Sequence, residues 1–166
     1  MDLSLYMPEW LLAHGAAFLI ALPLLMAAIT AILPSRKFVW WTTSFITLIL
    51  AVAALALAQF EVANGASIYQ MGGWAPPHGI SLKIDALSAP LLVLISAMAL
   101  VTMFYAMPAT LAEIEPKKRA PYYAAFLLCI AGLLGMVITE DAFNVFVFLE
   151  VSSISTYVLV ALGSSR

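Results

Sequence analysis

Glu150 is the side chain with the clearest chemical potential, because it is the single charged residue in the apolar stretch 142–163. It is the ninth residue of that stretch, so in a helix it would lie about 12 Å along the axis, near the middle of a bilayer's hydrocarbon. A carboxyl group surrounded by hydrocarbon holds its proton more tightly than in water and exchanges it nearer to neutral pH. Charged groups within a membrane typically mark pathways for ions or protons. The position of Glu150 therefore predicts a proton relay; the alternative is a structural acid that is held protonated or in a fixed ion pair.

Polar side chains accompany Glu150 along the same stretch. Ser153 and Tyr157 follow it by three and seven residues, a spacing that puts them on one helical face. Asn144 is a further candidate for this supporting polar face. Other hydroxyl groups belong to Ser152, Ser155 and Thr156. Together these groups favour a hydrated or hydrogen-bonding seam. Taken one by one, they are more typical of hydroxyl groups that hold membrane helices together.

The charged residues at the expected helix ends have simpler explanations. Glu140 and Asp141 come just before 142–163, and acids near a helix N-terminus need no further function. An attraction for incoming cations is the functional alternative for these two outer acids. Lys83 and Asp85 are expected to form an interfacial charge pair, with Asp85 capping the next helix. A lateral role in charge transfer is the alternative for this pair.

No residue pattern predicts chemistry of the enzymatic kind. His14 and His78 have no companion residues, and the single cysteine, Cys129, can form neither an internal disulfide nor a metal site alone. The sequence contains no phosphate-binding loop, cysteine cluster or hydrolase triad. We therefore expect no metal and no cofactor, and a transporter subunit rather than an enzyme.

The composition explains how an acid such as Glu150 comes to lie among apolar residues. Of 166 residues, 64% are hydrophobic and 10% are charged, against about 45–50% and about 25% in ordinary globular chains. The mean hydropathy is +1.06. These values exclude a disordered chain, a basic nucleic-acid-binding domain and a secreted disulfide scaffold. They indicate an all-α integral membrane protein.

Five apolar stretches are each long enough to cross a bilayer as a helix, which requires about 20 residues. They are 11–33, 38–60, 84–107, 120–138 and 142–163. The connections on one side of these spans carry six of the seven basic residues, which are Arg36, Lys37, Lys117, Lys118, Arg119 and Arg166. Because basic connections face the cytoplasm, we expect the N-terminus outside and the C-terminus in the cytoplasm. The outside connection 61–83 is rich in glycine and proline and is expected to be a structured turn with room for a short hairpin.

Two stretches are specific enough to carry a family resemblance. Residues 72–88 read GGWAPPHGISLKIDALS, and residues 139–151 read TEDAFNVFVFLEV, followed by Ser153, Ser155 and Tyr157. Together they resemble the antiporter-like subunits shared by Mrp-type monovalent cation/proton antiporters and respiratory complex I. The D-type member of the Mrp antiporter subunits is the best match. The resemblance extends from the first apolar stretch to Arg166.

The resemblance implies a subunit of about fourteen helices with two five-helix repeats of inverted topology. Residues 1–119 would hold three N-terminal helices and the outside loop 61–83, and residues 120–166 the first two helices of the first repeat. Glu150 matches the family's glutamate in the fifth helix, which pairs with a lysine two helices further on. That lysine and the second repeat are absent from this sequence, so the chain resembles the N-terminal part of a longer polypeptide.

Three functions follow as hypotheses. The first is proton translocation within a Na⁺ or K⁺/proton antiporter complex in the bacterial inner membrane, with other membrane subunits, lipid and the transported ions as partners. The second is the same relay within the membrane arm of an NADH:quinone oxidoreductase or a membrane-bound hydrogenase. The third is a structural membrane module without transport.

Overall fold

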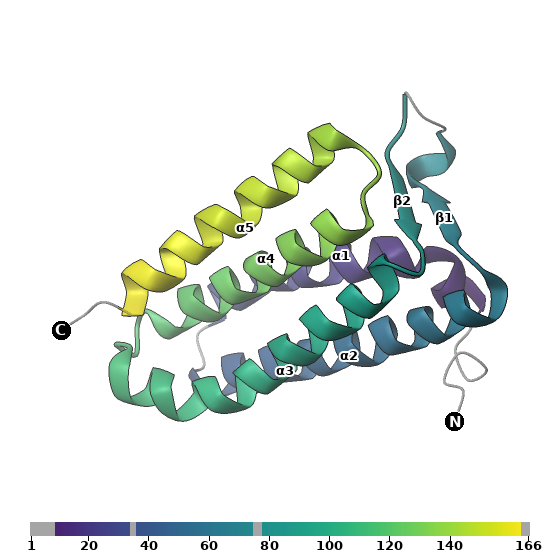
Figure 1. Cartoon of the computed structure of the whole chain (residues 1–166). Helices are drawn as coiled ribbons and strands as arrows, with labels where there is room; N and C mark the ends of the chain where they lie inside the picture. The colour runs from purple at the N-terminus through teal and green to yellow at the C-terminus, as the bar shows by residue number, and fades with distance from the viewer. Residues whose placement is uncertain (1–8, 34–35, 75–77, 164–166) are drawn as a thin grey trace.

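Five long helices and one short hairpin make up the structure, a computed structural model that describes residues 9–33, 36–74 and 78–163 (Figure 1). The helices are α1 (Glu9–Ile32), α2 (Arg36–Asn64), α3 (Ser88–Glu113), α4 (Arg119–Ile138) and α5 (Ala142–Gly163). Each contains a segment long and apolar enough to cross a membrane. The five predicted spans are therefore confirmed, and an all-helical arrangement satisfies the backbone polar groups that hydrocarbon cannot.

The bounds of α3 differ from the expected stretch 84–107 at both ends. Ile84 belongs to a strand, so the helix begins at Ser88. At the other end the helix continues through Pro108 to Glu113. Arg119 stabilises this end, because its Nε atom donates to the carbonyl oxygens of Thr110 and Ile114 at 3.2 and 3.1 Å. A guanidinium group there satisfies carbonyl groups that a helix end leaves unpaired.

The connection after α2 contains the expected hairpin. Strands β1 (Ser67–Gln70) and β2 (Ser81–Ile84) pair in antiparallel register, with Ser67 opposite Ile84. A short turn, η2 (Met71–Gly73), follows β1, and its Gly72 and Gly73 have φ angles of 68° and 76°. Only glycine adopts this left-handed conformation at little cost. The first four residues of the expected loop, 61–64, instead complete α2.

The helices run back and forth, so their connections gather at two ends of the bundle. Figure 1 shows the α3–α4 connection and the C-terminal end of α5 at one end, and the hairpin and the α4–α5 turn at the other. The basic residues 117–119 thus lie at the opposite end from Lys83. This separation agrees with the charge pattern; which end faces the cytoplasm stays a prediction.

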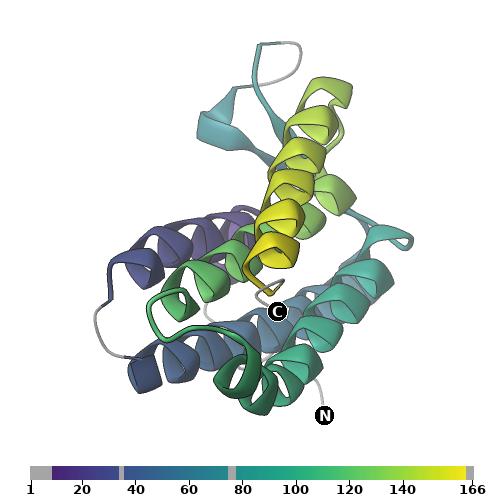
Figure 2. The same ribbon diagram turned by 90° about the vertical axis from the view of Figure 1, so that its left-hand side faces the viewer.

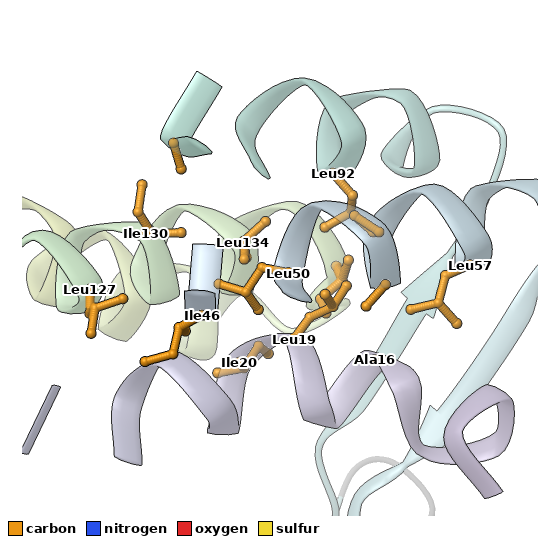
Figure 3. Packing of buried hydrophobic residues seen from close by; sticks show 14 of the residues in the cluster. Ala16, Leu19, Ile20, Ile46, Leu50, Leu57, Leu92, Leu127, Ile130 and Leu134 are labelled. Atoms are coloured by element: carbon orange, nitrogen blue, oxygen red, sulfur yellow. The ribbon is translucent and has the colours of Figure 1, made fainter. Parts of the chain in front are cut away.

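The buried core lies among α1, α2, α3 and α4. Figure 3 shows side chains from all four meeting, for example Leu19 of α1, Leu50 of α2, Leu92 of α3 and Leu134 of α4. All four are fully buried. By contrast, α5 is the least buried of the five helices and α4 the most buried. Figure 2 shows α5 stacked on α4 at the side of the bundle.

Glycines of α4 set the distance at which α5 packs. A Cβ atom added to Gly132 would lie 2.7 Å from the carbonyl oxygen of Phe148 and 2.8 Å from the backbone nitrogen of Ser152. A Cβ atom at Gly135 would meet the ring of Phe148 at 2.5 Å. The absence of a side chain at these positions allows the two backbones to approach closely, as small residues commonly do in membrane helix pairs.

We predict that Gly132→Ala destabilises the α4–α5 pair, because the new methyl group would overlap backbone atoms of α5. Overpacking of this kind costs about 1–3 kcal/mol. Thermal unfolding in detergent measures the effect, with Gly163→Ala as the matched control, because a Cβ atom there meets nothing within 4 Å. Equal stability of the two variants would contradict the close packing.

Candidate functional site

Glu150 lies midway along α5, on the face that points away from α4. Its side chain is exposed, and large exposed apolar side chains surround it on the same face, including Phe146 and Ile154 at 59% and 57% exposure. The ion pairs Lys83–Asp85 and Lys118–Glu115 do not involve Glu150. The helices described here therefore leave the carboxylate open to whatever covers this face of α5.

The supporting polar face is only partly as expected. Tyr157 is 73% exposed and lies two turns after Glu150 on the same face, and Ser153 is half-buried beside it. The assignment of Asn144 to this face is wrong. Asn144 precedes Glu150 by six residues, which turns it about 240° around the helix. It is 9% exposed, and its Nδ2 atom donates to Oδ2 of Asp141 at 2.9 Å.

The other hydroxyl groups of α5 form a separate seam against α4. Cys129 of α4 lies between Ser152 and Thr156, with its Sγ atom 3.6 Å and 3.5 Å from their hydroxyl oxygens. The Thr156 hydroxyl also donates to the carbonyl oxygen of Ser152, and the Ser155 hydroxyl to that of Val151. This seam fits the interpretation of these hydroxyl groups as contacts that hold helices together. The mid-helix position of Cys129 predicts a packing role, but the sequence gives no local signal of its two partners, which are 23 and 27 positions away.

The two outer acids make different contacts. Glu140 accepts a hydrogen bond from the hydroxyl group of Ser81 at 2.7 Å. Asp141 accepts one from the backbone N–H of Phe143 at 3.1 Å and so caps α5, in agreement with an acid at a helix N-terminus. Sequence reasoning did not identify Ser81, which is 59 residues from Glu140 in the chain.

The structure brings Lys83 and Asp85 together at the beginning of α3. Lys83 Nζ lies 3.5 Å from Oδ2 of Asp85. Oδ1 of Asp85 accepts hydrogen bonds from the backbone N–H groups of Ser88 and Leu87, at 2.9 and 3.1 Å. These backbone donors, that of Ser88 first, lower the pKa of the Asp85 carboxyl group below its ordinary range. This geometry is that of an interfacial charge pair and helix cap.

Metal ligands do not cluster within the described residues: no three His, Cys, Asp or Glu side chains come together there. His14 instead lies against the hairpin, where its Nδ1 atom is 3.2 Å from the hydroxyl oxygen of Tyr69. His78 is exposed near the hairpin tip. Both histidines are consistent with interfacial positions.

Comparison with known proteins identifies relatives among subunits of NADH-quinone oxidoreductase and of cation/proton antiporters. The chain is 40% identical over 158 residues to the N subunit of the NADH-quinone oxidoreductase of Desulforudis audaxviator, covering 93% of this chain and 31% of that protein. It is 32% identical over 165 residues to the D subunit of the probable K(+)/H(+) antiporter of Rhizobium meliloti, covering 95% of this chain and 30% of the relative. It is 30% identical over 115 residues to the D subunit of the Na(+)/H(+) antiporter of Alkalihalophilus pseudofirmus, covering 69% of this chain and 23% of the relative. No protein-family model matches the chain.

Solved structures support the same placement. A chain of the membrane-bound sulfane sulfur reductase, an archaeal respiratory membrane complex, matches with a TM-score of 0.80 and 32% identity over 92% of this chain and 31% of its own length. A chain of the Mrp complex from Dietzia sp. DQ12-45-1b matches with a TM-score of 0.75 and 30% identity, over 89% of this chain and 27% of its own length. This chain thus spans between 23% and 31% of the length of these relatives.

The fold and these relatives define a multi-pass helical subunit of a bacterial cell membrane. The chain belongs to the antiporter-like subunits that Mrp-type antiporters share with complex I-like respiratory complexes, and it corresponds to their N-terminal part. The family resemblance carried by residues 72–88 and 139–151 is confirmed.

We predict that Asp85 contributes to the loss of thermal stability at low pH. Because its folded-state pKa is lowered, the stability it contributes is present above the ordinary carboxyl pKa of about 3.9 and is lost as pH falls through the lowered folded value. Asp85→Asn should therefore flatten the loss of thermal stability below about pH 4. Glu115→Gln, an exposed acid in the α3–α4 connection, is the control. If Asp85→Asn lost as much thermal stability at acid pH as the unchanged protein does, the prediction would be contradicted.

Proposed function

We propose that this chain takes part in proton translocation within a monovalent cation/proton antiporter complex, with Glu150 as the mid-membrane proton relay. The observation that carries the proposal is the placement of one carboxylate halfway along an otherwise uncharged spanning helix. Such a group costs several kcal/mol if it faces lipid, so it is retained where it serves a pathway.

The two faces of α5 support this assignment. Its buried face holds the helix to α4 through Gly132, Phe148 and Ser152. Its opposite face carries Glu150 and Tyr157 and remains open to further protein. A basic group approaching from that side would favour the charged carboxylate, and its withdrawal would favour the protonated form. In the family pattern that group is a lysine two helices beyond Glu150's helix.

The division of the chain follows from the same proposal. Residues 1–119 would form the three N-terminal helices with their outer loop, and residues 120–166 the first two helices of the first five-helix repeat. Na⁺ or K⁺ is the proposed counter-ion, because relatives are named for exchange of each. Ser153 and Tyr157 are proposed to line the relay.

A second candidate is the proton-pumping membrane arm of a respiratory complex. The 40% identity to the N subunit of an NADH-quinone oxidoreductase and the TM-score of 0.80 to the sulfane sulfur reductase favour it. The same relay would then be driven by electron transfer. Other membrane subunits are partners in both cases.

We predict that Glu150→Gln lowers ion-driven proton flux of the intact complex in vesicles by about 100-fold, the lower end of what a positioned acid–base group contributes. Glutamine keeps the size of the side chain but cannot exchange a proton. Glu115→Gln makes the same substitution in the α3–α4 connection and should retain normal flux. Near-normal flux in Glu150→Gln would reject the relay.

We expect the native complex to distinguish the two machines by its composition. Purification in mild detergent through a tag on this protein, followed by mass spectrometry, should recover small hydrophobic membrane subunits alone if the complex is an antiporter. Recovery of flavin and iron–sulfur subunits would instead establish the respiratory complex.

A further inference from the structure

Contacts at the outer end of α5 join it to the hairpin. The Ser81 hydroxyl group donates to Oε2 of Glu140 at 2.7 Å, and the backbone N–H of Glu140 donates to the carbonyl oxygen of Ser81 at 3.2 Å. Leu82 and Thr139 form an antiparallel bridge beside them. We name these four residues the outer clamp. The clamp joins the α4–α5 turn to the edge of β2 through this isolated bridge.

The strand side of this clamp is firmly fixed. Ser81 is 4% exposed, Leu82 and Ile84 are 1% exposed, and the latter two belong to the buried core. Three residues after Leu82, Asp85 caps α3 through two backbone hydrogen bonds. The clamp therefore connects the beginning of α5 to an element that is anchored in the core and to α3.

Side-chain packing does not replace the clamp on this side. A cavity of about 310 Å³ lies between the beginning of α3 and the α4–α5 turn, lined among others by Leu91, Ile138 and Glu140. Further along, α5 packs on α4 through the glycine contacts and through the seam around Cys129. The outer end of α5 is thus held against β2 by the hydrogen bonds between Ser81 and Glu140.

We infer that Glu140 is a positioning residue for Glu150, acting through the outer clamp, and not a charge that attracts cations. Glu140 comes two residues before α5, and Glu150 is the ninth residue of that helix, about 12 Å along its axis. Fixing the outer end of α5 against β2 fixes the direction in which Glu150 leaves the helix. This inference rests on the proposed relay of Glu150.

The two roles of Glu140 predict different responses to substitution. Glu140→Gln removes the charge but keeps an oxygen that accepts the Ser81 hydroxyl, whereas Glu140→Ala removes both. Positioning predicts that Gln restores most of the proton flux that Ala loses. It also predicts that the pH midpoint of the remaining flux moves in Glu140→Ala, because Glu150 enters a changed environment. Equal losses in both variants, or loss in Ala with an unmoved pH midpoint, would overturn the inference.

Amide hydrogen exchange of the whole complex, read by mass spectrometry over residues 139–146, tests the clamp without reference to transport. Loss of a hydrogen bond to a charged group predicts exchange about tenfold faster in Glu140→Ala. Ser81→Ala should match it, and the double variant should add little, because both remove one contact. Unchanged exchange in both single variants would reject the clamp. The two proposals can fail separately. If Glu150→Gln keeps its proton flux while amide exchange rises in Glu140→Ala and Ser81→Ala, the relay is rejected and the clamp is supported.

Discussion

The energetic cost of a carboxylate in hydrocarbon is the constraint on which this structure depends. A carboxylate facing lipid costs several kcal/mol, and Glu150 occupies the middle of a helix whose other residues are uncharged. The described helices leave this group uncovered. They contact α5 on its α4-facing side, and the face bearing Glu150 is the opposite one. The bundle of α1 to α4 acts as a support against which that helix is placed.

The support is divided between two kinds of contact. Close backbone packing at Gly132 and Gly135 sets the distance between α4 and α5. Hydrogen bonds at the outer end, from Ser81 to Glu140 and from Phe143 to Asp141, locate the beginning of the helix. Van der Waals packing at small residues sets how closely the helices approach, and hydrogen bonds add directional contacts. Both are needed to define the rotation of a helix that has one free side.

Much of the fold could be predicted from the sequence, because charge-free runs of about 20 residues leave a helix as the simplest spanning structure. The bounds of α5 agree with the expected 142–163. The end of α3 lies beyond the expected residue 107, because the side chain that caps the helix past Pro108 is Arg119 of the next helix. Helical spacing placed Tyr157 beside Glu150, but Asn144 was assigned by its polarity and not by its angle around the helix. The partnership of Ser81 with Glu140 joins residues far apart in the chain, and periodicity carries no information about such contacts.

The position of Cys129 gives this chain a built-in reporter. It is the single cysteine of the sequence, and its sulfur lies between hydroxyl groups of α5. The stretching frequency of an S–H bond depends on the strength of the hydrogen bond that it donates, and it falls in a window of the infrared spectrum where proteins otherwise absorb little. A change in the S–H stretching frequency of Cys129 would therefore report separation or sliding of α4 and α5.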